Sequence, residues 1–337
     1  MVEGAMFAVS QTLTKHVDEV WVIKFKYDGS ALASGSKDKA AIIWKKRLKE
    51  LHPSKQSYNW TPELILDHPG AVSCLSWSLD SSILLTSSAS HPGSHHIDRV
   101  QSGKLLRTHN EHHETVTGLE FITRDNVFVS AALDRRIIIW DSDGNVRVVL
   151  DPLNLRIIGI AVSTQFSLII TLGLGTGPES KEVQGKAGFN TLMRINIDTK
   201  QTSLLSELEG DLVSAEMSKD SKYVLVNRGK NDILLLDLKT GQTVNTYRGL
   251  TQTRHVIRSC FGGLHDSFVI SGSEDGKVYV WDRVTAELRQ VLLRHGEGTV
   301  NSVVWNPAST EMFASCSDDG SGKVWEMSIA RSVSVGS

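Results

Sequence analysis

The sequence has 337 residues, and its 36 Lys and Arg nearly balance its 38 Asp and Glu, which leaves a formal net charge of −2. A chain this close to neutral creates no global field that would attract nucleic acid or an anionic membrane. Hydrophobic residues make up 40% of the chain, and 27 Gly with only 7 Pro exclude a low-complexity sequence. We therefore expect one globular body whose partners are proteins, with no nucleic-acid or membrane partner.

The chain shows no signal for export or for membrane insertion. No apolar run approaches the ~20 residues that cross a bilayer, and the N-terminus lacks a basic region followed by an apolar stretch and a cleavage site. Three cysteines, Cys74, Cys260 and Cys316, lie within apolar strand-like segments and not in CxxC pairs. They are expected to be reduced core residues. These features predict a cytoplasmic protein, with the nucleus as a second location.

A six-residue segment that ends in a large apolar residue recurs along the chain. Seven of these apolar hexapeptides occur, in chain order VWVIKF ending at Phe25, VSCLSW at Trp77, VTGLEF at Phe121, IIGIAV at Val162, LVSAEM at Met217, VIRSCF at Phe261 and VNSVVW at Trp305. Their endings are 41 to 55 residues apart. Self-similarity at this period is typical of one supersecondary unit repeated around a ring.

A second marker repeats in the same register. Turn residues such as 27–30 (YDGS) precede short apolar runs such as 31–33 (ALA), a pattern that predicts strands. Each unit is therefore expected to hold about four short strands, and the seven units to form one closed all-β body. The second marker is an Asp followed six residues later by a Trp, and it occurs in four units: Asp38 and Trp44, Asp134 and Trp140, Asp275 and Trp281, Asp319 and Trp325.

These residues resemble the WD40 repeats of β-propellers, whose units end in Trp-Asp and carry an Asp in a tight turn with a His upstream of it. Trp140-Asp141 and Trp281-Asp282 match the ending literally. The resemblance implies a single seven-bladed propeller in which a buried network of His, Asp, Ser or Thr, and Trp pins the strands of a blade together. The residues expected in this structural network are His16, Asp38, Trp44, His112 or His113, Asp134, Trp140, Asp275, Trp281, His295, Asp319 and Trp325.

Ser, His and Asp in several units also resemble parts of a hydrolase triad, but we interpret them as structural. A catalytic triad requires one convergent set with a nucleophile and an oxyanion site, whereas this set is multiplied around the ring. The sequence therefore predicts a protein that is not an enzyme, with no catalytic residue, no cofactor and no small-molecule substrate.

The two ends of the chain are expected to meet in the last blade. The seventh unit stops after the strand that carries Trp325, so it lacks one strand. Residues 5–13 (AMFAVSQTL) form a strand-like segment that precedes the first unit. We expect this segment to be the outer strand of blade seven, which would leave only short, protected edges. The propeller is thus expected to span residues 5–327, followed by a flexible tail over residues 328–337.

The units are unequal. The second has Asp98 where we expect a Trp, the fourth has lost both markers, and the fifth has Leu236-Asp237 in place of Trp-Asp. Their strands stay apolar, as in residues 233–236 (ILLL). We therefore expect blades two, four and five to keep their packing while the polar network is lost.

Three insertions offer alternative sites. His91, His95 and His96 could hold a zinc ion, because imidazole is a common zinc ligand, but no Cys or carboxylate lies at ligand spacing. Residues 173–177 (GLGTG) resemble a phosphate-binding loop but lack the following Lys and Ser or Thr. The basic run 45–49 (KKRLK) is expected to lie in a solvated loop underneath the propeller. An enzyme, or a metal or nucleotide binder, that uses top-face loops is the weaker alternative, and we expect no metal.

The candidate partner surface is the top face of the propeller. Arg254, His255 and Arg258 surround a blade-to-blade loop. Arg anchors protein interfaces and forms bidentate bonds to carboxylates, so the expected ligand is an acidic peptide or an acidic protein loop. Trp21 and Asn301 are the second residues of their hexapeptides, a position that faces the top funnel in WD40 propellers. The same resemblance places the residues just before the turn Asp at this rim: Lys37, Glu274 and Asp318.

More specifically, the chain resembles the WD-repeat subunit of GID/CTLH-type E3 ubiquitin ligases. The resemblance rests above all on residues 247–252 (YRGLTQ) and 259–263 (SCFGG), with 16–21 (HVDEVW) and 304–307 (VWNP) in support. The SCFGG run is not demanded by the blade pattern. The match is strong in blades one, six and seven and weak in blades two to four. That family usually carries LisH and CTLH helices before its propeller, and we expect this chain to lack them.

The resemblance implies a scaffold that binds substrates or regulators of such a ligase in ubiquitin-dependent protein degradation, with ligase subunits or an acidic peptide segment as partners. The alternative is a generic WD40 adaptor in signalling, RNA processing or trafficking, because propellers serve many functions. The identity of the partner separates the two hypotheses.

Overall fold

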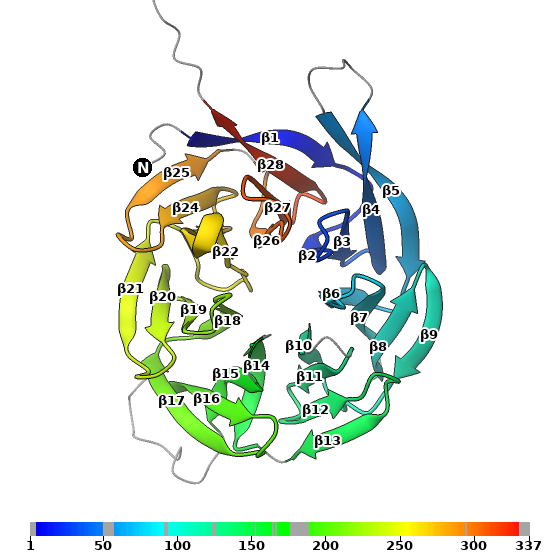
Figure 1. Ribbon diagram of the computed structural model, residues 1–337, viewed down its shortest axis with the longest axis vertical. Coiled ribbons are helices and arrows are strands. Elements are labelled where there is room, and N and C mark those ends of the chain that lie inside the picture. The colour runs from blue at the N-terminus through cyan, green and yellow to red at the C-terminus, as the bar shows by residue number, and fades with distance from the viewer. Residues whose placement is uncertain are drawn as a thin grey trace, which may run out of the picture.

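The computed structural model shows seven antiparallel four-stranded sheets, or blades, arranged around a central axis (Figure 1). It describes residues 5–49, 57–90, 94–122, 126–151, 153–163, 165, 167–175, 189–293 and 295–329. Within these residues every named element is a strand except η2 (Leu264–Asp266), so none of the helices described is long and apolar enough to cross a membrane. The prediction of an all-β, seven-bladed propeller is confirmed.

The first four blades run in chain order from an inner strand to an outer strand. Blade one contains β2 (Val20–Phe25), β3 (Ala31–Ser36), β4 (Ala40–Lys49) and β5 (Ser57–Asp67). Blade two contains β6 (Ala71–Trp77), β7 (Ile83–Ser90), β8 (Ser94–Gln101) and β9 (Lys104–His109). Blade three contains β10 (Val116–Phe121), β11 (Phe128–Ala132), β12 (Ile137–Trp140) and β13 (Val146–Leu150). Blade four contains β14 (Leu155–Val162), β15 (Leu168–Gly175), β16 (Phe189–Asn196) and β17 (Thr202–Glu209).

The last three blades complete the ring. Blade five contains β18 (Leu212–Met217), β19 (Tyr223–Arg228), β20 (Asp232–Asp237) and β21 (Thr243–Arg248). Blade six contains β22 (Cys260–Gly262), β23 (Phe268–Ser271), β24 (Val278–Asp282) and β25 (Leu288–Leu292). Blade seven contains β26 (Val300–Trp305), β27 (Met312–Ser317), β28 (Gly322–Ile329) and, as its outer strand, β1 (Ala5–Leu13). Six of the apolar hexapeptides are inner strands, while only the end of the sixth, VIRSCF, lies in β22.

The two ends of the chain close the ring by pairing with each other. Strand β1 runs antiparallel to β28, from Ala5 opposite Ile329 to Leu13 opposite Gly322, and Figure 1 shows the two strands side by side at the rim. Closure of blade seven by the N-terminal strand is thereby confirmed. Strand β28 runs two residues past the expected end of the propeller at 327. Residues 330–337 of the expected tail lie outside the described residues.

The hydrophobic core lies between neighbouring blades. In blade three the rings of Phe128 and Trp140 stack 5.5 Å apart, and in blade seven Phe313 and Trp325 stack at 5.8 Å. Phe7 of β1 packs edge-on against Phe313 at 5.1 Å, so the closing strand adds to the same core. Cross-strand aromatic pairs of this kind stabilise a sheet beyond the area they bury. Each Trp of the second marker is therefore a packing anchor for its blade.

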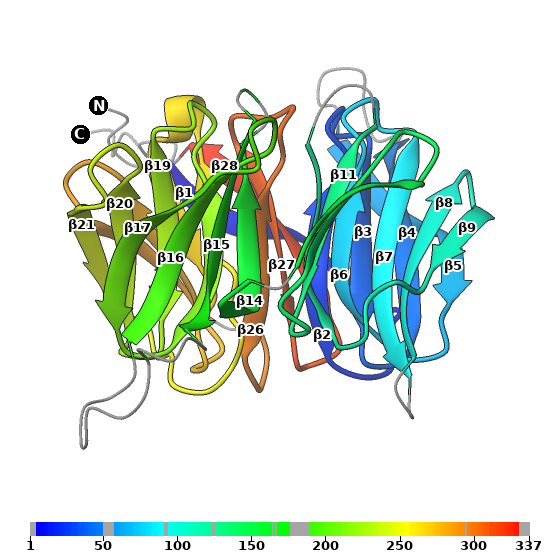
Figure 2. The ribbon, with the colours of Figure 1, turned by 90° about the horizontal axis from the view of Figure 1, so that it is seen from below.

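The strands run between two faces of the ring, as the side view shows (Figure 2). The top face carries the connections between blades and between the second and third strands of a blade. The bottom face carries the connections between the first and second strands, and between the third and fourth. The η2 turn connects β22 to β23 and so lies on the bottom face, which points upward in Figure 2.

Strands β4 and β5 form a long hairpin where we expected a solvated loop. Their pairing continues past Trp44 to Lys49 opposite Ser57, so the basic run belongs to a strand. Gln11 of β1 fastens this hairpin, because its side-chain amide donates to the Trp60 carbonyl at 2.7 Å and its oxygen accepts from the Trp60 N–H at 2.6 Å. The expectation of a loop was wrong because the basic residues pair with the neighbouring strand, in which Trp60 is buried, and the local charge pattern does not reveal this partner.

Candidate functional site

The repeated polar network of blade one is complete. His16 bonds through Nδ1 to Asp38 at 2.8 Å and through Nε2 to the Ser34 hydroxyl at 2.8 Å, and Trp44 Nε1 donates to the same hydroxyl at 2.9 Å. Burial lowers the pKa of His16. Although burial opposes ionisation of Asp38, bonds from the Val17 N–H and from His16 hold its pKa below the ordinary value.

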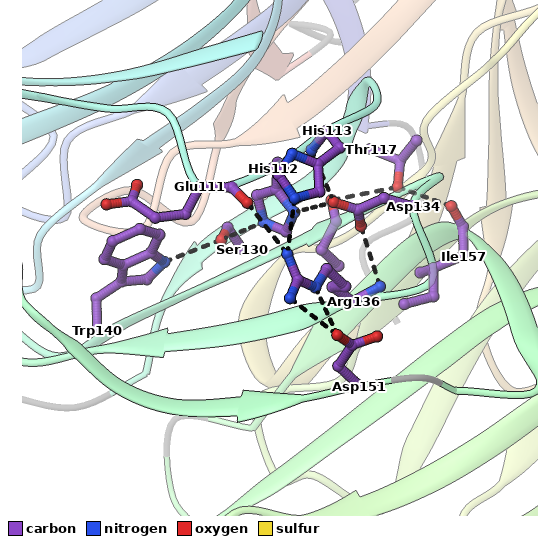
Figure 3. Close-up of polar contacts among 11 residues, drawn as sticks. Glu111, His112, His113, Thr117, Ser130, Asp134, Arg136, Trp140, Asp151 and Ile157 are labelled. Atoms are coloured by element: carbon purple, nitrogen blue, oxygen red, sulfur yellow. Dashed lines mark hydrogen bonds and ion pairs between the residues drawn. The ribbon is translucent and has the colours of Figure 1, made fainter.

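Blade three repeats this network residue for residue (Figure 3). His112 bonds to Asp134 at 3.0 Å and to Ser130 at 2.8 Å, and Trp140 Nε1 donates to Ser130 at 2.9 Å. His112, and not His113, is therefore the network residue. Figure 3 shows His113 directed to Arg136 instead, at 3.1 Å. Because each serine is buried and its oxygen also accepts a hydrogen bond from a Trp indole, we interpret these sets as contacts that hold the strands together.

Blades six and seven depart from the expected network. In blade seven, Trp325 bonds to Ser315 at 2.7 Å, but His295 reaches Asp319 only at 3.4 Å, and its buried Nε2 has no hydrogen-bond partner among the described residues. In blade six no His of the described residues bonds to Asp275. This carboxylate accepts from the Tyr279 hydroxyl at 2.8 Å and from Lys277 at 2.7 Å, and Trp281 donates to the Arg248 carbonyl. Asp275 and Trp281 thus make structural contacts in blade six, but with Tyr279, Lys277 and the Arg248 carbonyl and without a His.

Blade two keeps part of a network that the sequence analysis missed. His68 bonds to the Thr86 hydroxyl at 2.7 Å, and Asp98 lies 3.8 Å from its Nε2. In blade one Trp44 pairs with Leu32, and at the equivalent position of blade two Val100 pairs with Leu84. Val100 therefore takes the place of the Trp, whereas we had assigned that place to Asp98, which lies two residues earlier. A spacing of 18 residues from His to hydroxyl, shared by blades one, two and three, would have revealed His68.

The inner strand of blade six leaves its own sheet near the top face. Arg258 forms a parallel bridge with Ser302 of blade seven, and its N–H donates to the Asn301 carbonyl at 2.9 Å. Its guanidinium reaches across the central channel and donates to the carbonyls of Trp21 and Ser73, both at 3.3 Å. Arg258 therefore connects blade six to blades seven, one and two. Two of its five N–H donors are used inside the ring and the residue stays half-buried, so its contact with a partner remains a prediction.

Glu274 fixes the backbone of the loop that carries two other candidates. Its Oε1 accepts from the N–H groups of Thr253, Arg254 and His255 at 2.7 to 3.0 Å, and its Oε2 accepts from the Thr253 hydroxyl at 2.7 Å. Burial opposes ionisation, but these bonds hold the pKa of Glu274 down at about 2. Glu274 is therefore a positioning residue. It presents the exposed side chains of Arg254 and His255 at the top face.

Trp21 and Lys37 meet at one carboxylate on the rim of blade one. Trp21 Nε1 donates to Glu19 at 2.9 Å, and Lys37 donates to its other oxygen at 2.7 Å. The bonds from Lys37 and Trp21 lower the pKa of Glu19. The half-buried indole is thus held in a fixed orientation at the top face.

Asn301 and Asp318 bond to each other below the rim of blade seven. Asn301 is buried, and its amide donates to Asp318 at 2.6 Å and to the Val20 carbonyl at 2.9 Å. Our prediction that Asn301 contacts a partner is therefore corrected, because its side chain ties blade seven to blade one. Asp318 also accepts from the Thr299 N–H at 3.3 Å and remains half-buried.

The top-face surface that stays available to a partner is smaller than the sequence predicts. It includes the half-buried Trp21 and the exposed Lys37, Arg254, His255 and Val256. Because Glu19, Glu274 and Asp318 lie beside these residues, the surface carries mixed charge. Mixed charge around an aromatic residue is typical of protein interfaces.

The alternative sites gain no support from the geometry. His91 lies outside the described residues, His95 is placed only as part of strand β8, and His96 bonds to Asn110 at 2.5 Å. Within the described part of the chain, no group of three or more His, Cys, Asp or Glu residues is placed to hold a metal ion. Gly173 lies inside β15, where a Cβ atom would stand 2.2 Å from the Arg156 carbonyl oxygen, so close strand packing explains this glycine. Thr176 and Gly177 of the glycine-rich run lie outside the described residues.

Five segments of the chain match the model of a known protein family. Residues 7–45, 60–91, 103–141, 242–282 and 286–326 match the family model described as WD domain, G-beta repeat. Together these segments make up more than half of the chain. The longest unmatched stretch between them, residues 142–241, holds blade four and most of blade five, where the Asp and Trp markers are missing.

Several longer proteins resemble this chain over most of its length. It is 33% identical to the WD repeat-containing protein WDS homolog of Arabidopsis thaliana and 30% identical to the WD repeat-containing protein 26 homolog of the same plant, in both cases over 94% of the chain and over 57% and 50% of the relative. It is 29% identical to GID complex subunit 7 of Schizosaccharomyces pombe, over 92% of the chain and 57% of that protein. The chain spans about half the length of these relatives.

Proposed function

Because the chain belongs to the WD40-repeat family, we propose that it is a non-catalytic protein-interaction scaffold associated with a GID/CTLH-type E3 ubiquitin ligase. In this role it binds substrates or regulators in ubiquitin-dependent protein degradation, in the cytoplasm or the nucleus. The observation that carries the proposal is the similarity to GID complex subunit 7, which extends over 92% of this chain. The SCFGG run and the YRGLTQ segment, which are not required by the blade pattern, point the same way.

The geometry supports a scaffold that presents a preformed surface. Glu274 fixes the backbone that carries Arg254 and His255, and Glu19 fixes the Trp21 indole, so the loop and the indole are held before any partner arrives. Preorganised side chains lose less conformational entropy on binding, which improves affinity without adding contact area. An aromatic residue and an Arg at the centre of such a surface are the residue types that dominate interface energies.

The test is affinity purification of the protein tagged at its own locus, followed by mass spectrometry. Recovery of RING-type ligase subunits in near-equal amounts supports the proposal. If no ligase subunit is recovered while other proteins are, the chain is a free-standing adaptor of the signalling, RNA-processing or trafficking type, and the ligase function is refuted.

Variants of the top face sharpen this experiment. Trp21→Ala combined with Arg254→Glu should reduce recovery of the top-face partner at least tenfold, because the two changes remove the indole and reverse a charge on the proposed contact surface. Arg147→Glu, an exposed change on the outer strand β13, is the matched control and should leave recovery unchanged. Equal recovery with both variants would place the partner on another face.

A further inference from the structure

One ring of side chains in the central channel carries unbalanced charge. Its members are the fifth residues of the seven apolar hexapeptides, and all of them line one cavity of about 290 Å³ along the axis. The ring therefore contains one ammonium group and two carboxyl groups. In chain order the members are Lys24, Ser76, Glu120, Ala161, Glu216, Cys260 and Val304.

Only one of the two carboxyl groups, that of Glu120, accepts hydrogen bonds from the described residues. Glu120 accepts from Lys24 at 2.9 Å through one oxygen and from the Ser76 hydroxyl at 3.0 Å through the other. Glu216 receives no hydrogen bond and no ion pair from the described residues. Burial raises the pKa of Glu216 to about 7, against the opposing effect of the Lys24 charge. A carboxyl group without a donor in a confined space is costly to ionise, and a ligand that brings a donor would remove that cost.

A second acid lies at the bottom mouth of the channel. The SCFGG run leads into η2, and a Cβ atom on Gly262 would stand 2.2 Å from the Trp305 ring. The turn that follows has left-handed backbone at Gly263 (φ 77°), and also at Asp266 (φ 55°), whose carboxylate is buried. Oδ2 of Asp266 accepts from the Lys219 N–H at 2.9 Å. Oδ1 has no hydrogen bond among the described residues, and the Lys219 ammonium stays 3.8 Å away from it.

The channel continues into a wider cavity on the bottom face. This vestibule has a volume of about 630 Å³ and shares the lining residues Lys219, Asp266 and Pro307 with the channel. The two cavities therefore adjoin each other at Asp266. Towards the top, the channel is crossed by Arg258, whose guanidinium is bonded to the carbonyls of Trp21 and Ser73.

We propose that the vestibule and the lower channel form a receptor for one cationic side chain, a lysine or an arginine, of a protein segment that lies across the bottom face. The nitrogen donors of that side chain bond to Glu216, and Asp266 guides them at the mouth. Ala161, Met217 and Val304 line the channel and pack against the aliphatic stem. An organic cation fits better than a metal ion, because the described residues offer no cluster of three or more metal-ligating side chains.

The test uses two small probes on the isolated chain, N-acetyl-lysine methylamide and N-acetyl-norleucine methylamide, titrated at pH 8 with ligand-observed NMR. The lysine probe should bind saturably, and the norleucine probe, which keeps the stem and lacks the ammonium, should bind at least tenfold more weakly. Glu216→Gln should weaken binding of the lysine probe at least tenfold. Glu311→Gln, an exposed acid on the same face, should leave it unchanged. Equal binding of both probes overturns the proposal.

Wild-type protein gives a second readout that needs no variant. Binding requires the ionised Glu216, so affinity for the lysine probe should rise about tenfold from pH 6 to pH 8. The other titratable or charged groups that line the same cavity are Lys24, Tyr27, Cys74, Glu120, Lys219, Arg258, Cys260 and Asp266. Burial raises the pKa of Tyr27 and of Cys260, and Glu120 and Glu216 raise that of Lys24 in spite of its burial, so none of these three titrates in this window. Affinity that does not change with pH overturns the proposal. No ligase component takes part, so this outcome is independent of the function proposed above.

Discussion

His109, the last residue of β9, makes the stability of the propeller depend on pH. Its ring is buried between blades two and three, 4.5 Å from the Trp140 ring and 5.7 Å from Phe128, and neither ring nitrogen has a hydrogen-bond partner among the described residues. Burial lowers its pKa to about 4, with Arg107 and Arg99 adding to the effect. The folded protein therefore keeps His109 neutral at pH values where the unfolded chain protonates it.

The sign and size of the effect follow from this difference. As the pH falls below about 6.5, the unfolded state takes up a proton that the folded state refuses until about pH 4, so the free energy of unfolding decreases. With an ordinary pKa of 6.5 in the unfolded chain and about 4 in the folded one, the loss between pH 7 and pH 5 is about 2 kcal/mol. The His109→Phe variant keeps the ring packing and removes both nitrogens. It should lose about 2 kcal/mol less than wild type over this interval.

The assay is urea unfolding at pH 7 and at pH 5, followed by tryptophan fluorescence, for wild type and His109→Phe. The exposed His113 supplies the matched control, and His113→Phe should retain the wild-type pH dependence. The buried residues His16 and His68 also have lowered pKa values and leave part of the dependence in every variant. If wild type and His109→Phe lose the same free energy between the two pH values, the buried-histidine argument is wrong.

Three further changes test the packing. Gly262→Ala should destabilise the protein by about 1–3 kcal/mol through overpacking against Trp305, seen as a lower melting temperature. Gln11→Ala removes both bonds to Trp60 and should lower the free energy of unfolding by about 1–3 kcal/mol, with faster amide hydrogen exchange confined to β5 and β1. Faster exchange spread evenly over all blades would contradict a local role of Gln11. Trp281→Ala removes a fully buried ring and should cost about 3–5 kcal/mol in chemical unfolding, while an exposed Leu264→Ala should cost little.

The fold was predictable from sequence because each blade repeats the same local pattern. The spacing of Asp and Trp identified the register in blades that have a Trp on the third strand. The strand-like residues 5–13 belonged to none of the seven units, which predicted that they complete blade seven. The spacing did not reveal the polar network of blade two, because Val100 occupies the position of the Trp that marks this network in other blades.

The site was harder to predict, because its contacts join residues far apart in the chain. Arg258 bonds to carbonyls of Trp21 and Ser73, which are 237 and 185 residues away, and no local pattern records such a contact. Glu274 was recognised as a rim residue, but its role in holding the Arg254 loop depends on three backbone N–H groups. Glu216 looked like an ordinary polar position of a strand until the ring placed it beside Lys24 and Glu120.

Pairing of β1 with β28 also sets the order in which the molecule can be completed. Strand β1 is synthesised before its partner β28, which follows more than 300 residues later in the chain. Six blades are made of strands close in sequence and can form during synthesis, whereas the seventh requires closure of the longest loop in the chain. Until β1 pairs with β28, the Phe7 ring is not packed against Phe313, and the outer edge of β28 has no hydrogen-bonded neighbour. The nascent chain is thus most exposed to chaperones and to misassembly just before ring closure.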